Sequence, residues 1–557
     1  MDNTTLRQRD RVDLEPLLQE EGNNDGDSSR LSSDDGGSHH HHEYTTKATC
    51  CSNFSPGSIS NLCSATLGAG ALSLPYAISL TGIVFGILLL LLSAYLTIIS
   101  INIIIEACVV TQQFKFEDVS KRLAGPSMAI ALEASLLVFC FGTAVAYIVA
   151  VGDILDQGLH SIGFLWEPGS KFVSIYSKER VMILFWTVML LPLSLQTKLK
   201  RLEKFSSLGV LSIIFLVISA VIHSIIHGDV IGSGTNSSSP VEVKSLLWPK
   251  SFASMLQAFP IIIFAFSCQV NVCQIYEELK PTTPSITEDT ESNVTILKLK
   301  QQLMEHITRN GIILCTSLYL LIGVFGFLDF TNTTTDDILI NYCIQVTHDA
   351  LMTAATFSVF VAVVVAFPFN ILPARVTLKV IFDRLKAKRR RRSLCVKATN
   401  CLCLNREPSL GEDTNSQRTP VSLEIDAGSP IRSDVRVSPI EPLLADNIPG
   451  HNSASVVEHV LITLLLSGGA LIVAIFVPSI SIVFGLMGGT AASIISFILP
   501  GMFAQKMEER NGSMSRIGKA FVWGGFVIGI LTTGVTLYGI FNNESADSTT
   551  SCTSEYR

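Results

Sequence analysis

Charged residues are scarce in this sequence, and the residue patterns of enzymes are missing from it. Only 16% of the 557 residues are charged and 48% are hydrophobic, and the mean hydropathy is +0.44. A soluble chain of this length carries more charge and less apolar surface. No Ser/His/Asp or nucleotide-binding constellation is present, so we expect neither an enzyme nor a cofactor. The lipid bilayer is the expected solvent of this protein.

The cysteines and the N-terminus lack the signs of a metal site, a disulfide framework or a cleaved leader. Several of the 13 cysteines fall inside apolar runs, where a free thiol is a packing residue. Cys395, Cys401 and Cys403 resemble a zinc cluster only loosely because no second pair accompanies them. The chain starts with polar and acidic residues, so no signal peptide is expected and the first span must direct membrane insertion. A net charge of -7 gives no reason to expect a nucleic-acid partner.

About eleven segments are long and apolar enough to cross a bilayer, which requires about 20 residues in a helix. We predict an all-α membrane protein with spans at residues 59–80, 83–105, 128–151, 181–195, 206–227, 252–275, 311–330, 351–371, 457–478, 480–503 and 521–541. The fourth is short, and glycines interrupt the first. These spans fall into two blocks, 56–381 and 457–541, with a tail at 542–557 after the second.

Basic residues predict the orientation, because they are retained on the cytosolic side. The loops that contain Lys115, Lys198, Lys280 and Lys506 are rich in lysine and arginine, whereas residues 331–348 contain none. This places the N-terminus in the cytosol and the C-terminus outside or in a lumen. A glycoprotein is expected, although sequons occur on both predicted sides of the membrane and support the orientation only weakly. The sequon asparagines are Asn53, Asn236, Asn293, Asn332, Asn511 and Asn543.

Two polar segments are predicted to be disordered and cytosolic, the leader at 1–55 and a loop at 382–456. The loop opens with a basic cluster, Lys386 to Arg392, which suits anionic lipid headgroups or serves only as a topology anchor. In the leader, residues 13–18 resemble an acidic dileucine sorting motif. That motif predicts a vacuolar or lysosomal membrane, with the plasma membrane as the alternative.

The first span contains a group of residues that weakens a helix. Gly68, Ala69, Gly70 and Ala71 precede Pro75 in the middle of the apolar run. Glycine costs about 1 kcal/mol relative to alanine in a helix, and proline lacks a donor N–H. Backbone groups freed in lipid must be satisfied by protein, water or substrate, so a break here is expected to line a cavity. The alternative is that the small residues serve close helix packing.

The sixth span is interrupted by polar residues, Ser267, Gln269 and Asn271. Amide side chains are costly in hydrocarbon, so we expect Gln269 and Asn271 to face the bundle interior. Bonds between helices are the alternative use of these side chains. Tyr147 on the third span is a further site candidate because a buried hydroxyl needs a partner, although core packing is the commoner fate of a tyrosine.

Spans one and six occupy corresponding places in two five-helix halves, and paired interrupted helices point to a transporter built from inverted repeats. The N–H groups of a broken helix receive an anionic group such as an α-carboxylate. An amino acid fits the first break. Ionisable residues otherwise lie near span ends, where interfacial anchoring is the usual role and proton coupling the less common one. They are Glu106, Glu133, Asp153, His223 and His227.

Four stretches resemble the amino acid/auxin permease family, especially its system A/N-type neutral amino acid transporter branch. They are residues 58–82, 264–279, 367–375 and 484–500. The resemblance covers about residues 55–541. It implies a LeuT-like fold with a 5+5 inverted repeat plus one C-terminal helix, and secondary active transport of amino acids, by symport or exchange. The competing hypothesis is an amino acid sensor that signals through its leader or loop.

The sequence departs from sodium-coupled members of that family at the coupling-ion site. Ser64 stands where those members have asparagine, and Val364, Val365 and Ala366 stand where they have threonines. Ser64 and Ala366 are therefore only weak candidates for ion binding. We expect proton coupling or exchange rather than sodium coupling. Gln269 replaces the histidine of the neutral branch, which leaves the substrate amino acid open.

Overall fold

The computed structural model of this protein describes residues 56–161, 177–196, 206–227, 246–279, 290–347, 349–404, 453–477, 479–507 and 514–541. Every regular element in these ranges is helical, which confirms the all-α membrane class. The leader with its dileucine motif and most of the predicted loop lie outside the described residues, as do Asn53, Asn236, Asn511 and Asn543.

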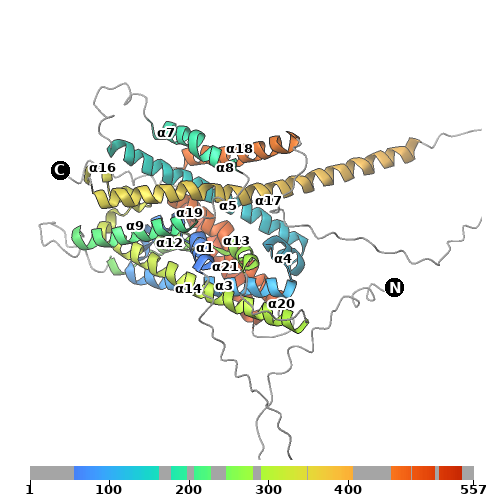
Figure 1. Ribbon diagram of the computed structural model, residues 1–557, viewed down its shortest axis with the longest axis horizontal. Coiled ribbons are helices and arrows are strands. Elements are labelled where there is room, and N and C mark those ends of the chain that lie inside the picture. The colour runs from blue at the N-terminus through green and yellow to red at the C-terminus, as the bar shows by residue number, and fades with distance from the viewer. Residues whose placement is uncertain are drawn as a thin grey trace, which may run out of the picture. The chain divides into compact units, whose positions relative to one another are not determined.

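Figure 1 shows the helices with their labels. Those of the first five expected spans are α1 (Pro56–Thr66), η2 (Ala69–Ser73), α2 (Leu74–Thr81), α3 (Ile83–Thr111), α4 (Phe116–Leu123), α5 (Pro126–Ser161), α7 (Lys178–Phe185), η4 (Trp186–Leu190), α8 (Leu191–Ser194) and α9 (Ser206–His227). Those that follow are α12 (Phe252–Ala265), α13 (Gln269–Glu278), α14 (Thr290–Phe330), η7 (Thr331–Thr333), α15 (Ile338–Asn341), α16 (Ile344–Thr347), α17 (Ala350–Leu404), α18 (Ser453–Phe476), α19 (Ile480–Met487), η8 (Gly488–Ala492), η9 (Ile494–Ile498), α20 (Leu499–Met507) and α21 (Met514–Phe541).

The expected count of eleven spans is not confirmed. Within the described ranges nine helices are long and apolar enough to cross a membrane, and ten if the bent pair Gly57–Thr66 and Ala69–Thr81 is one span. The segment expected at 181–195 is missing from that set. It consists of α7, the π-helix η4 and α8, which together are shorter than a bilayer crossing requires. Span numbers below follow the expected order along the chain.

α17 continues well beyond the expected end of the eighth span. It runs to Leu404, so residues 382–404 are helical where a disordered loop was predicted. Two ion pairs hold this helix to its neighbours. Arg384 Nη1 lies 2.6 Å from Glu133 Oε2 on α5, and Lys386 Nζ lies 3.0 Å from Glu458 Oε1 on α18. The basic cluster therefore begins on a helix that is anchored at its membrane end.

The helices differ in how much of their surface other helices cover. The most apolar stretches of α5 and of α12 with α13 are each 78% buried, whereas that of α21 is 17% buried. On α21, Trp523, Ile530 and Phe541 are strongly exposed. Large apolar side chains on an outward face are what lipid requires. α5, α12 and α13 are therefore central, and α21 is peripheral.

Spans six and ten approach each other at a glycine. A Cβ atom on Gly488 would lie 1.9 Å from the carbonyl oxygen of Pro260. Pro260 lies inside α12, and Gly488 begins the π-helix η8. Both partners at this point are backbone, so no side-chain rotation relieves the contact. Only glycine fits here, and π-turns of this kind are common at functional sites.

Gly488→Ala should destabilise the protein. Overpacking typically costs about 1–3 kcal/mol, and this contact is closer than most. The measurement is the thermal unfolding temperature of the detergent-purified protein. Gly524→Ala is the matched control, because Gly524 has nothing within 4 Å of its added Cβ and alanine favours a helix. A Gly488→Ala protein as stable as the control would contradict the tight packing.

Candidate functional site

The first span is broken where the small residues predicted it. α1 ends at Thr66, η2 begins at Ala69, and the two halves meet at an angle of 50°. Gly68 has an extended backbone conformation between them. η2 and α2 continue as one helical segment, and the first N–H groups of a helix have no intrahelical acceptor. Around the break, the Gly68 N–H donates to the Thr66 carbonyl at 2.9 Å and the Ala71 N–H donates to the Gly68 carbonyl at 3.2 Å. The backbone donors left at the break in the interior of the bundle are those of Ala69 and Gly70.

The sixth span is also broken, although less sharply. α12 ends at Ala265 and α13 begins at Gln269, with Phe266, Ser267 and Cys268 between them. Together, α12 and α13 form one apolar helix that is long enough to cross a membrane, so the bend between them is smaller than that in the first span. The Ser267 N–H donates to the Phe264 carbonyl at 3.0 Å, which tightens the last turn of α12. Both interruptions of the predicted inverted-repeat pair are thus present.

One tyrosine joins the two breaks. The hydroxyl of Tyr319 on α14 lies 2.6 Å from the carbonyl oxygen of Thr66 and 2.9 Å from that of Ala265. Each acceptor is the last helical residue before a break. Tyr319 is fully buried, and its ring packs edge-to-face against Phe266 at 5.2 Å. The sequence reasoning missed this residue. A tyrosine in the middle of an apolar span was its only signal.

Gly70 brings the two broken helices into contact. A Cβ atom on Gly70 would lie 2.9 Å from the Cα and 3.1 Å from the Cβ of Ala265. The packing role that the Gly-x-Gly spacing left open is therefore real for this glycine. Gly68 differs, since its added Cβ would meet only the hydroxyl of Tyr147, at 3.1 Å.

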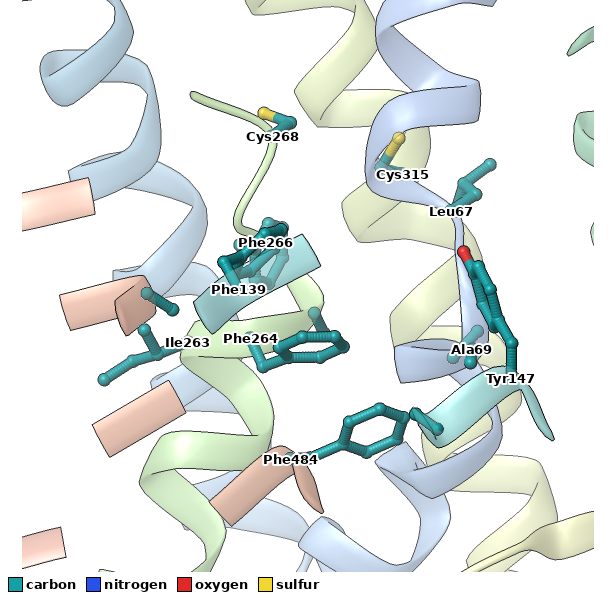
Figure 2. Packing of buried hydrophobic residues seen from close by; sticks show 14 of the residues in the cluster. Leu67, Ala69, Phe139, Tyr147, Ile263, Phe264, Phe266, Cys268, Cys315 and Phe484 are labelled. Carbon is teal, nitrogen blue, oxygen red and sulfur yellow. The ribbon is translucent and has the colours of Figure 1, made fainter. Parts of the chain in front are cut away.

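A cavity of about 40 Å³ lies beside the first break. Figure 2 shows the buried Tyr147 lying along the chain between Leu67 and Ala69. The only lining residues with polar side chains are Ser64 and Tyr147. The lining residues come from spans one, three, five and eight: Ser64, Leu67, Gly68, Ala69, Leu72, Tyr147, Gly209, Ile213, Val359, Ala362, Val363 and Ala366. The site combines free backbone groups with an apolar wall.

The two weak ion-site candidates, Ser64 and Ala366, line the same cavity. The other eighth-span residues in the lining are Val359, Ala362 and Val363, which have no side-chain oxygen. The carbonyl of Ala366 accepts a bond from the Asn370 amide at 3.3 Å. Hard cations require several oxygen ligands, and Ser64 offers one hydroxyl.

The sixth-span candidates do not reach this cavity. Ser496 Oγ on η9 donates to Gln269 Oε1 at 2.9 Å and lies 3.3 Å from Ser267 Oγ. Gln269 is fully buried, as expected, but it faces the tenth span. Asn271 is exposed, so the prediction that it faces the bundle interior is wrong. Residues two apart on a helix point in different directions, so Gln269 and Asn271 cannot share one face.

The bundle is closed on the predicted non-cytosolic side of the first break. Ser73 Oγ on η2 donates to the Asp336 carbonyl at 2.6 Å. The Asp336 carboxylate accepts from Ser479 Oγ at 2.5 Å and from the Ser481 N–H at 3.1 Å, at the start of the tenth span. The segment between spans seven and eight thus connects spans one and ten. The cavity, by contrast, includes Ser64 and Gly209 from the predicted cytosolic halves of their spans.

The sequence profile described as "Transmembrane amino acid transporter protein" matches residues 56–542. The chain belongs to this family. Membership places it among transporters rather than in an enzyme class. The match runs from the first helix that the structure describes to the end of the last, so it includes both broken spans and the cavity between spans one, three, five and eight.

Individual transporters of the family are similar to this chain over different lengths. "Vacuolar amino acid transporter 6" of Saccharomyces cerevisiae is 24% identical over 83% of this chain and 92% of its own length. "Sodium-coupled neutral amino acid transporter 7" of Danio rerio is 24% identical over 88% of this chain and 89% of its own length. "Vacuolar amino acid transporter 5" of Schizosaccharomyces pombe is 29% identical, but the match covers 51% of this chain and 60% of that protein.

Proposed function

We propose that this protein is a secondary active transporter that moves neutral amino acids across a vacuolar or lysosomal membrane by alternating access. The break of the first span carries the proposal, because it presents backbone donors beside a cavity. The α-carboxylate is held in the segment from Gly68 to Ala71, where the N–H groups of Ala69 and Gly70 are left to donate, and Tyr147 contributes its hydroxyl. Similarity to transporters whose names include vacuolar and neutral amino acid supports the compartment and the substrate class.

The character of the cavity wall supports a neutral substrate. None of the lining residues carries a charged side chain, and most are aliphatic. A charged substrate side chain placed there would lose its hydration without gaining a partner, which is costly. An apolar or small substrate side chain has no such cost. Ser267 and Gln269 remain candidates for contacts in other states of the transport cycle.

Proton coupling or exchange is the mode that we favour. Ser64 supplies one oxygen, and the lining stretch of the eighth span supplies no side-chain oxygen. Anionic lipids at the basic cluster from Lys386 to Arg392 are a further proposed partner, since the helix that carries the cluster is anchored by Arg384 and Lys386.

A flux assay across an amino acid panel tests the proposal. The full chain is reconstituted in liposomes, and labelled amino acids are offered under imposed sodium and pH gradients. We expect saturable uptake of neutral amino acids that responds to a pH gradient or to amino acid inside the vesicles. Replacement of sodium by choline should change the rate less than about twofold.

Three outcomes would contradict parts of this proposal. Substrate binding without flux would indicate a sensor. A strict requirement for sodium would exclude the coupling that we favour. Uptake confined to charged amino acids would show that the apolar cavity is not the substrate site.

A further inference from the structure

Two side chains converge on one carboxylate at the non-cytosolic ends of spans five and seven. His223 Nδ1 on α9 lies 3.3 Å from Asp329 Oδ2 on α14. The Tyr342 hydroxyl lies 3.2 Å from the same oxygen. Tyr342 belongs to the segment 331–347, here called the outer loop, and its ring packs edge-to-face against His223 and Phe330 at 5.0 Å in each case. The cluster therefore joins two spans to the outer loop.

The carboxylate at the centre of this cluster is not fully satisfied. The Asp329 side chain is 1% exposed, and its Oδ1 atom has no hydrogen-bond partner among the described residues. A buried ionised carboxylate with a bare oxygen is costly. Uptake of one proton by the histidine and carboxylate together relieves this cost, either as an imidazolium paired with the carboxylate or as a carboxylic acid.

Tyr342 is suited to act as a fixed donor in this cluster. Burial, together with the negative charge of Asp329, raises the pKa of Tyr342 well above its usual range. The hydroxyl thus keeps its proton at all physiological pH values. His223 and Asp329 are the other two ionisable groups of the cluster.

The outer loop faces the predicted non-cytosolic compartment and covers the first break. Cys343 in this loop is disulfide-bonded, a bond that is typical of oxidising compartments. Through Asp336 the same loop contacts Ser73 and the start of the tenth span. If the cluster holds Tyr342 more or less tightly, the outer loop moves with it. The contacts of Asp336 that close the bundle on this side of the cavity then change as well.

Other charged groups also face the outer loop and must be distinguished from the cluster. Lys178 forms an ion pair with Asp153 on α5. Asp337 caps α15 through the Leu339 N–H at 3.0 Å, and burial and the charge of Asp153 raise its pKa well above the usual range. Asp156 also lies close enough to affect Asp153. Asp337 is the competing proton acceptor.

We propose that His223, Asp329 and Tyr342 form a proton-binding site open to the non-cytosolic compartment, and that a proton bound there holds the outer loop closed. This inference rests on the proposed transport function. When the loop opens, Tyr342 leaves the carboxylate, water reaches Asp329 and the proton is held less tightly. By linkage, a group that binds a proton more tightly in the closed state makes closure more favourable as the pH falls.

The sign of the effect follows from the charges. Protonation of His223 turns the contact between a neutral imidazole and the Asp329 carboxylate into an ion pair, which is stronger. This stabilisation requires the bound proton, so it is present at acidic pH and is lost as the pH rises. Acid on the non-cytosolic side therefore drives the protein toward the state that opens to the cytosol, and the bound proton enters the transport cycle together with substrate.

The test compares His223→Gln with His306→Gln in the full-length protein. His306 lies exposed near the middle of α14, well before Asp329, and contacts Arg309. Uptake of labelled alanine into liposomes is recorded while the pH on the non-cytosolic face varies from about 5 to about 8, the range in which histidine titrates. We expect a severalfold change in maximal rate for the wild type and for His306→Gln, and less than a twofold change for His223→Gln, with similar KM values in all three.

A second measurement needs no flux. The thermal unfolding temperature of wild type should exceed that of His223→Gln at pH 5, and the gap should close by pH 8. Parallel curves would overturn the proposal even if transport were normal. A retained pH response in His223→Gln that disappears in Asp337→Asn would assign the proton to Asp337 instead. Absence of alanine flux in every variant would count against the proposed function, whereas the unfolding curves would still decide the proton site.

Discussion

Gly70→Leu will abolish amino acid transport while the protein still reaches its membrane. The added Cβ atom alone would lie 2.9 Å from the Cα atom of Ala265, so a leucine must push η2 away from α12. Overpacking of this kind costs about 1–3 kcal/mol. If that cost falls on the states in which the two breaks lie together, flux drops by about 10- to 100-fold. The measurement is flux normalised to the amount of transporter in the membrane.

Gly534→Leu is the matched control for this substitution. Gly534 lies on α21 and has nothing within 4 Å of its added Cβ, so transport should persist. Gly70→Ala adds only the Cβ atom and should give an intermediate loss. Wild-type flux in Gly70→Leu would mean that the contact between the two breaks has no role in transport.

Tyr319→Phe should reduce the maximal transport rate about 10- to 100-fold. The substitution removes only the hydroxyl and keeps the ring that packs on Phe266. The Thr66 carbonyl still accepts from the Gly68 N–H at 2.9 Å, whereas the Ala265 carbonyl loses the donor that Tyr319 supplies. A buried polar group without a partner costs about 1–3 kcal/mol. Because Tyr319 connects helix ends and does not line the cavity, the loss should appear in the maximal rate rather than in KM.

Tyr538→Phe provides the comparison for this prediction. Tyr538 lies on the peripheral helix α21 and is strongly exposed, so its hydroxyl should be dispensable. Kinetics of both variants are measured in liposomes across a range of substrate concentrations. A rise in KM with an unchanged maximal rate in Tyr319→Phe would place the hydroxyl in substrate binding instead of in the link between the breaks.

The two broken spans could be predicted because their cause is local. Glycine and proline weaken a helix wherever they occur, so Gly68 and Gly70 mark the first break without any knowledge of neighbouring helices. Tyr319 is different. Its role depends on two carbonyl groups, at Thr66 and Ala265, that are far apart in sequence and meet only after the bundle has formed. No local pattern contains that information.

The orientation of Gln269 and Asn271 shows a second limit of prediction from sequence. Polarity predicts that both avoid lipid, but it does not say which helix each one faces. Gln269 bonds to Ser496 on the tenth span, and Asn271 is exposed. Helical periodicity separates two residues that are two positions apart, because their side chains point in different directions. On α13 that periodicity is enough to exclude a shared inward face for Gln269 and Asn271, whereas the choice of the tenth span as partner depends on the packed bundle.

The ends of the spans could not be predicted accurately from hydropathy, which measures only how apolar a segment is. α17 continues as a helix through a charged segment beyond residue 381 because Arg384 and Lys386 find carboxylate partners on α5 and α18. Those partners lie on other helices, so a window of apolar residues ends too early. For the fourth segment, hydropathy predicted a span that the structure does not contain. The π-helix η4 divides this helix, and the segment stays short.

The small volume beside the first break bears on measured affinity. About 40 Å³ accommodates a few water molecules, whereas an amino acid is considerably larger. Substrate must therefore select a wider arrangement of spans one, five and eight that is only partly populated. The apparent dissociation constant then equals the intrinsic one divided by that population. A substitution that loosens these helices without touching the site should tighten apparent binding while slowing the return to the closed state.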